Sequence, residues 1–249
     1  MSAEAVIETR GVHKCFGGFT ALKNVSVKVP AGKLTSIIGP NGAGKSTYFN
    51  LLSGALAPTE GQVFFEGRDV TGLKPHEFAR IGIAKSFQIT NLFPNFTALE
   101  NARIALQAHV SRYGLWRRRE TLEGLGAQAL QLLELVGLQE RANYLARELA
   151  HGQQRALEIA VALAARPKLL LMDEPTAGMS PEETKTMMGL IQGLARERTV
   201  VLVEHKMKMV MGISDHIVVL HHGELLAQGT PDDIRNNETV KAVYLGQGH

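Results

Sequence analysis

Two kinds of hydrophobic pattern divide the chain. In residues 23–29 the valines Val25, Val27 and Val29 alternate with polar side chains, which predicts a half-buried strand near the edge of an antiparallel sheet. Four further stretches are apolar without interruption: residues 34–38, 169–172, 200–203 and 217–220. Continuous apolar runs are typical of strands that helices cover on both faces, so these stretches predict a mainly parallel core sheet.

The clearest helix signal begins at Ser180. Serine is a favoured N-cap residue, Pro181 suits the first turn of a helix, and Glu183 completes a capping box. We therefore predict a helix over residues 181–195.

The middle of the chain lacks strand patterns. Thr97 and Glu100 form a second capping box, and no convincing strand occurs over residues 93–165. This block therefore predicts a helical subdomain inserted into an α/β core. Two weaker strand signals precede it, at residues 61–65 and 83–87.

Composition fits one well-packed domain. The chain has 249 residues, of which 45% are hydrophobic and 20% are charged, so it can bury a substantial core. We expect residues 1–249 to form a single domain with two parts. One is an α/β core with an antiparallel β subdomain (1–92 and 166–249), and the other is the helical subdomain (93–165). No apolar run approaches the ~18 residues of a membrane span, and the first residues lack a signal-peptide core, so we expect a cytoplasmic chain.

Charge and cysteine content exclude other classes of protein. A net charge of +3 is too weak to indicate a nucleic-acid partner. The densest basic stretch, residues 117–119, is followed by Glu120 and Glu123, which favours a solvated helix face over a lipid or protein contact. Cys15 is the single cysteine, so the chain has no internal disulfide and fits a reducing compartment.

A glycine-rich loop joins the apolar run at 34–38 to a helix-like stretch at 48–52. It consists of Gly39, Pro40, Asn41, Gly42, Ala43, Gly44, Lys45, Ser46 and Thr47. Its glycines let the backbone turn and bring N–H groups onto the β- and γ-phosphates of a nucleotide. Lys45 adds a positive charge, and Ser46 offers a hydroxyl to Mg²⁺. The strand before the loop and the helix after it argue against the alternative, a simple turn.

An acidic pair follows the apolar run at 169–172. Open α/β sheets bind ligands at the carboxyl ends of their strands, where Asp173 would lie beside Mg²⁺ and Glu174 could orient or deprotonate the attacking water. Alone, such a pair is equally typical of a helix-capping turn. The phosphate loop upstream favours the catalytic interpretation. Gln88 and His205 follow two other predicted strands, so they fall near the same edge, although a lone glutamine is usually a surface amide and a lone histidine is more often a structural residue.

Residues 149–155 read Leu-Ala-His-Gly-Gln-Gln-Arg. With this segment the chain resembles the ATP-binding cassette (ABC) ATPase family. That family is recognised by a phosphate loop, a glutamine after the next core strand, a Leu-Ser-Gly-Gly-Gln-like signature, an Asp-Glu strand end and a switch histidine, all of which occur here in order. The resemblance implies ATP hydrolysis by a P-loop NTPase fold, in a head-to-tail dimer that holds ATP between one phosphate loop and the partner's signature helix.

The resemblance also assigns residue roles. Phe16, the aromatic residue before Gly17, would stack on adenine, although a packed core aromatic is the alternative. The other implied roles are phosphate neutralisation by Lys45, Mg²⁺ binding by Ser46, Gln88 and Asp173, general base catalysis by Glu174, γ-phosphate binding by His205, and contacts to the partner's ATP by Ala150, His151, Gly152 and Gln153.

The chain departs from the family pattern in two places. Ala150 stands where serine is usual and His151 where glycine is usual, so one hydroxyl contact to phosphate is absent. A charge-assisted hydrogen bond is worth about 1.5–3 kcal/mol, a loss that is tolerable if the helix N–H groups remain. Ser180 stands where aspartate is common, which puts communication between the two ATP sites in doubt.

Within the family, the chain is most similar to the ATPases of bacterial branched-chain amino acid importers. The motifs that carry this likeness are residues 150–155, 174–179, 203–207, 210–215, 229–231 and 244–246. It implies transmembrane permease partners, a second similar ATPase or a self-dimer, a substrate-binding protein reached through the permeases, and a position at the inner face of the membrane. Two other classes stay open: an ATPase for lipid or lipopolysaccharide export, and a soluble P-loop ATPase without a transport role.

Overall fold

The computed structural model describes residues 5–86, 92–110 and 119–245. Its strands are β1 (Ala5–Phe16), β2 (Phe19–Pro30), β3 (Leu34–Ile38), β4 (Glu60–Phe65), β5 (Arg68–Asp69), β6 (Ile83–Ser86), β7 (Leu169–Asp173), β8 (Thr199–Val203), β9 (His216–His221) and β10 (Glu224–Gly229). Its α-helices are α1 (Lys45–Leu52), α2 (Pro75–Ile81), α3 (Ala98–Val110), α4 (Arg119–Leu135), α5 (His151–Leu163), α6 (Pro181–Ala195), α7 (Met207–Ile213), α8 (Pro231–Asn236) and α9 (Glu238–Leu245). Two short 3₁₀ turns, η1 (Gln139–Arg141) and η2 (Ala146–Glu148), lie between α4 and α5.

A six-stranded sheet forms the centre of the molecule, in the order β10-β9-β3-β8-β7-β6. All its neighbouring strands run parallel except β10, which is antiparallel to β9. Leu170 and Met172 pack on one face with α3, α5 and α6, whereas Leu169 and Leu171 pack on the other face with α1. The continuous apolar runs therefore mark strands covered on both sides, as predicted.

A second, antiparallel sheet has the order β2-β1-β4-β5. Its edge strand β2 buries Val25, Val27 and Val29, which confirms the predicted half-buried edge strand. The sequence did not predict β1. Its pairing with β2 contains several register shifts, one of them between Thr9 and Val12, and these interrupt the period-two pattern.

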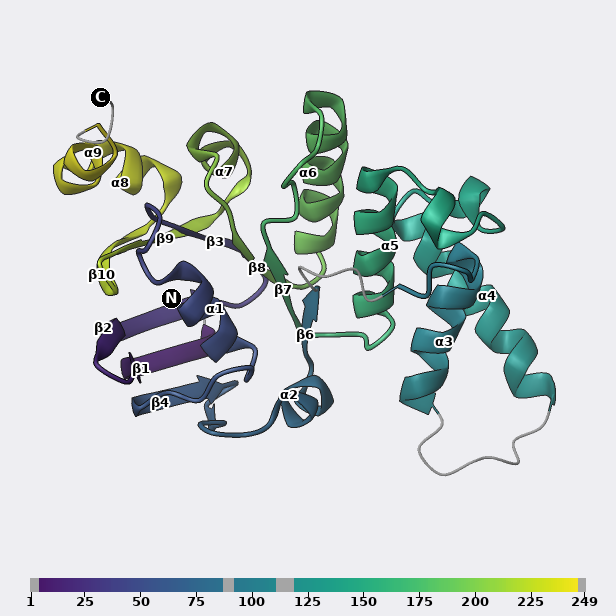
Figure 1. Cartoon of the computed structure of the whole chain (residues 1–249), viewed down its shortest axis with the longest axis horizontal. Helices are drawn as coiled ribbons and strands as arrows, with labels where there is room; N and C mark the ends of the chain where they lie inside the picture. The colour runs from purple at the N-terminus through teal and green to yellow at the C-terminus, as the bar shows by residue number, and fades with distance from the viewer. Residues whose placement is uncertain (1–4, 87–91, 111–118, 246–249) are drawn as a thin grey trace.

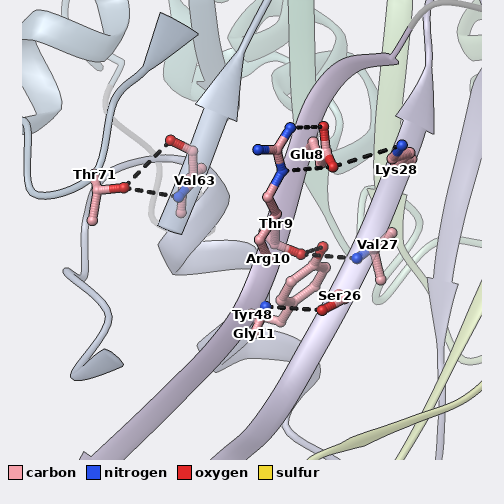
Figure 2. Close-up of polar contacts among 10 residues, drawn as sticks. All are labelled: Glu8, Thr9, Arg10, Gly11, Ser26, Val27, Lys28, Tyr48, Val63 and Thr71. Carbon is pink, nitrogen blue, oxygen red and sulfur yellow. Dashed lines mark hydrogen bonds and ion pairs between the residues drawn. The ribbon is translucent and has the colours of Figure 1, made fainter. Parts of the chain in front are cut away.

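Helix α1 lies against β2, β7 and β8, so it packs between the two sheets (Figure 1). Tyr48 on this helix is 1% exposed, and its hydroxyl lies 3.0 Å from Thr9 Oγ1, which also accepts a hydrogen bond from the Val27 N–H at 3.1 Å. Figure 2 shows these contacts beside two ion pairs of Glu8, one with Arg10 on the same strand and one with Lys28 on the neighbouring strand β2. The antiparallel sheet thereby fixes the helix that follows the phosphate loop.

Helices α3, α4 and α5 lie together on the side of the molecule away from the antiparallel sheet (Figure 1). The predicted box at the start of α3 is present: Glu100 accepts from the Thr97 N–H at 2.8 Å, and the Glu100 N–H donates to Thr97 Oγ1 at 3.1 Å. Within the described part of residues 93–165 the structure has no strand beyond an isolated bridge between Thr97 and Leu145.

Helix α6 spans the residues predicted for it, and its capping box is formed. The Ser180 hydroxyl accepts from the Glu183 N–H at 3.2 Å, and Glu183 accepts from the Ser180 N–H at 3.0 Å. The basic side chains at 117–119 lie outside the described part of the structure, and Cys15 is exposed. None of the helices in the described ranges has the length and apolar character to cross a bilayer.

Candidate nucleotide site

The parallel strands bring three sequence motifs to one edge of the central sheet. The phosphate loop begins after β3, Asp173 ends β7, and His205 follows β8. Because β3 pairs with β8 and β8 pairs with β7, these carboxyl ends are neighbours in the sheet. Gln88 follows β6, the next strand along, but lies outside the described residues.

The phosphate loop turns tightly into α1. Gly44 has φ +95°, and a Cβ there would lie 2.8 Å from the Ala21 carbonyl oxygen and from Leu22 Cδ2, so a side chain would be both strained and crowded. The first N–H groups of α1 have no partners within the helix and carry its positive dipole end. The loop residues from Asn41 to Thr47 line a cavity of about 270 Å³, and Glu174 lines it too. This arrangement suits a bound phosphate chain.

Lys45 occupies the interior of the loop. Its ammonium donates hydrogen bonds to the carbonyl oxygens of Gly39, at 2.7 Å, and Pro40, at 3.0 Å, and the residue is only 9% exposed. Burial lowers the pKa of this ammonium, while the carboxylates of Glu174 and Asp173 oppose the shift. A positive charge therefore lies between the phosphate loop and the acidic pair.

Asp173 is a buried carboxylate with spare coordinating capacity. It is 6% exposed, and its Oδ1 atom has no hydrogen-bond partner among the described residues. Burial raises the pKa of its carboxyl, and the nearby Lys85 ammonium acts in the opposite direction. An unpartnered buried oxygen, with the exposed hydroxyl of Ser46 on the loop, fits the oxygen preference of Mg²⁺.

The described residues contain no cluster of three or more acidic, histidine or cysteine side chains able to hold a metal ion. A magnesium ion here would therefore take its remaining ligands from phosphate oxygens and water, as is usual for Mg²⁺ at nucleotide sites.

Glu174 has a backbone conformation that is rare for its residue type. Its φ is +45°, and this conformation is held by hydrogen bonds from its N–H to the Val203 carbonyl at 3.0 Å and from the Ala177 N–H to its own carbonyl at 3.1 Å. Such left-handed residues cost about 1–3 kcal/mol and concentrate at functional sites. The turn aims the Glu174 side chain into the cavity of the phosphate loop.

His205 is held beside a buried acid that sequence reasoning missed. Glu204 is 0% exposed and accepts hydrogen bonds from the N–H and the hydroxyl of Thr176, at 3.2 and 2.6 Å. Its other oxygen lies 3.9 Å from Nδ1 of His205, whose side chain is 53% exposed. Glu204 therefore joins the strand end before the histidine to the loop after Glu174. The signal was a charged residue directly after a buried strand.

The aromatic residue expected to stack on adenine lies at a hairpin end. Phe16 is 46% exposed, with the Lys14 ammonium 5.2 Å from its ring centroid, so the packed-core alternative for Phe16 is wrong. Its cross-strand partner Phe19 is 66% exposed and lines the cavity of the phosphate loop. Sequence reasoning missed Phe19, although it follows the same pair of glycines.

The signature segment forms the start of α5. Ala150 is the N-cap, and the Gln153 side chain accepts from the Ala150 N–H at 3.1 Å. The N–H of Gly152 donates to Glu183 on α6 at 3.2 Å, and His151 is exposed. The structure thus presents a helix N-terminus at the signature, as predicted, with an unpredicted carboxylate bonded to it.

Comparisons with known proteins agree with this geometry. Residues 22–177 match the family model described as ABC transporter, and residues 224–249 match the model described as branched-chain amino acid ATP-binding cassette transporter. The chain is 44% identical to the high-affinity branched-chain amino acid transport ATP-binding protein BraF of Pseudomonas aeruginosa, over 97% of this chain and 98% of that protein. It is 41% identical to the corresponding protein LivG of Escherichia coli, over 98% and 99% of the two chains.

Solved structures match the fold along nearly the whole chain. An ATP-binding cassette of an ABC transporter in its ADP conformation superposes with a TM-score of 0.84 at 31% identity, covering 98% of this chain and 99% of that one. A dimeric bacterial ABC transporter cassette gives a TM-score of 0.76 at 32% identity, covering 90% and 98%. These likenesses confirm the predicted α/β fold class.

Proposed function

This chain belongs to the ABC transporter family of ATP-binding proteins, and from that premise we propose that it is the ATP-hydrolysing subunit of an importer for branched-chain or related amino acids. The observation that carries the catalytic part is one cavity lined by both the phosphate loop and Glu174. The substrate class is supported by the names of its relatives, BraF and LivG, and by the C-terminal match. An exporter or a non-transport ATPase has no comparable support.

In this role each residue has a task that its position permits. Lys45 and the first N–H groups of α1 bind the phosphates, and the adenine stacks on Phe16 or Phe19 at the hairpin end. Glu174 accepts a proton from the water that attacks the γ-phosphate. His205, held beside Glu204, contacts the γ-phosphate from the next strand end.

A magnesium ion fits the oxygen atoms that this edge offers. Asp173, Ser46 and Gln88 are the residues that would hold it directly or through water. When bound, the ion would neutralise charge on the β- and γ-phosphates. The Oδ1 atom of the buried Asp173 carboxylate, which has no hydrogen-bond partner among the described residues, would then gain a partner.

A second cassette completes the ATP site. The signature residues Ala150, His151, Gly152 and Gln153 reach the ATP of the other subunit, since Ala150 and His151 are exposed at the N-terminus of α5. The loss of a hydroxyl at Ala150 weakens a closed self-dimer, which favours pairing with a similar but distinct ATPase. The substrate-binding protein acts only through the permeases.

The permeases dock in a groove between the core and the helical block. This cavity of about 380 Å³ is formed by α2, β6, α3 and α5, and its walls are mostly small apolar side chains such as Ala105, Ala108 and Ala162. Lys85 lines the groove as well, and its ammonium bonds to Asn50 Oδ1 on α1 at 2.7 Å. The groove thus adjoins the helix of the phosphate loop. Docking there holds the chain at the inner face of the membrane.

Cysteine cross-linking tests this docking. In a Cys15→Ser background, A108C and A162C should form cross-links to a co-expressed permease because both positions line the groove. R103C is the matched control, since Arg103 is exposed on the same helix as Ala108 but lies outside the groove. Efficient cross-linking from position 103 with none from 108 or 162 would place the permease elsewhere.

A further inference from the structure

One carboxylate joins the signature helix to the helix after the catalytic loop. Glu183 Oε1 accepts the N–H of Gly152 in the first turn of α5 at 3.2 Å, and Oε2 accepts the Ser180 N–H at 3.0 Å. These backbone N–H groups lower the pKa of the Glu183 carboxyl, with a smaller contribution from His151. The side chain is therefore an anion placed at the positive end of α5.

The neighbouring residues are shaped for this contact. A Cβ on Gly152 would lie 2.9 Å from Glu183 Oε1, so a larger residue there would push the carboxylate away. Gly178 has φ +73°, and a Cβ there would lie 3.5 Å from Cε1 of His151, so the histidine ring packs beside this glycine. Two of the three residues that depart from the family pattern, His151 and Ser180, thus belong to one cluster around Glu183.

The same cluster is connected to the catalytic base by backbone hydrogen bonds. The Ala177 N–H donates to the Glu174 carbonyl at 3.1 Å, and the Met179 N–H donates to the Thr176 carbonyl at 3.3 Å. Thr176 is in turn bonded to the buried Glu204. The loop from Glu174 to Ser180 is therefore a short, internally bonded segment that ends at the cap of α6.

From these contacts we infer that Glu183 is a positioning residue that holds the N-terminal turn of the signature helix against the catalytic loop of its own subunit. The inference rests on the proposed ATPase cycle. In that cycle the γ-phosphate of the partner's ATP approaches the same helix end and needs the same N–H groups. Glu183 competes with that phosphate for the N–H groups and repels its charge. The two cassettes can therefore close on ATP only when Glu183 releases the Gly152 N–H.

Glu183→Gln tests the role of the negative charge of Glu183, because the amide has the shape of the carboxylate and keeps an oxygen that can accept the Gly152 N–H. In the assembled transporter we expect it to lower the half-saturating ATP concentration by about two- to fivefold, the range of a charge at a helix end, and to leave kcat unchanged. The control is Glu182→Gln, since Glu182 is an exposed acid in the first turn of the same helix. An unchanged or raised half-saturating concentration in the Glu183 variant would overturn the inference.

A second measurement is independent of turnover. In an amide proton–nitrogen correlation spectrum of the glycine-labelled full chain, Glu183→Ala should shift the Gly152 signal, because its N–H loses its acceptor, whereas Glu182→Ala should not. A Gly152 signal that is the same in both variants would show that the contact does not form in solution. This spectrum needs no ATP, so it fails or succeeds separately from the proposed ATPase function.

Discussion

Glu174→Gln should leave MgATP binding intact and lower ATP hydrolysis by about a hundredfold or more, the range of a lost general base. The amide has the shape of the carboxylate and can still orient water, but it cannot accept the proton. The left-handed turn at φ +45° places this side chain in the cavity of the phosphate loop, whereas Asp173, the other member of the acidic pair, does not line that cavity. Asp173, one residue earlier, is buried.

The measurement is single-turnover hydrolysis on purified protein, together with nucleotide affinity. Glu140→Gln serves as a control because Glu140 is exposed on a 3₁₀ turn of the helical block. Turnover close to that of the parent chain in the Glu174 variant would remove Glu174 from the role of base. If the variant bound ATP weakly and its turnover fell only as much as its binding, Glu174 would instead have a role in binding.

Lys45→Ala should weaken nucleotide binding by about ten- to a hundredfold, the value of a charge-assisted hydrogen bond. The folded loop already positions the Lys45 ammonium, which bonds to the carbonyl oxygens of Gly39 and Pro40. A phosphate that enters the cavity therefore meets a buried, pre-oriented cation. Without it, the phosphate charge would face Glu174 and Asp173, with only the loop N–H groups and the Lys85 ammonium near Asp173 to offset the repulsion.

Calorimetric titration with ATP checks this prediction. A thermal unfolding transition shows whether the variant is still folded. Lys33→Ala is the matched control, since Lys33 is a half-exposed lysine that pairs weakly with Asp215 at 3.9 Å. An affinity in the Lys45 variant within twofold of the control would mean that the loop binds phosphate through its backbone alone.

The central sheet could be predicted because its residues are covered on both faces. In β7, for example, Leu169 to Met172 have no polar position, and each side chain meets a packed cluster. Helix α6 could be predicted as well, since its capping box is local in sequence. In contrast, β1 escaped prediction because register shifts break its alternation, and the short helix α2 has only Phe78 buried.

The candidate site shows the same division. Linear motifs located Lys45, Asp173 and Glu174, because a strand followed by a loop fixes where each side chain must lie. The contacts of Glu204 with Thr176 and of Glu183 with Gly152 join residues 28 and 31 positions apart. No local pattern announces such pairs, since they depend on how β8 lies beside β7 and on how α5 meets α6.

Uptake by the assembled transporter tests the central claim most directly. The chain would be reconstituted in vesicles with its permeases, with and without a second ATPase, and supplied with the substrate-binding protein and radiolabelled leucine. We predict accumulation that requires ATP, that is lost when every copy of this chain carries Glu174→Gln, and that unlabelled isoleucine and valine reduce by competition. Intact ATP hydrolysis without uptake of any branched-chain amino acid, or uptake that persists without hydrolysis, would contradict the proposed function.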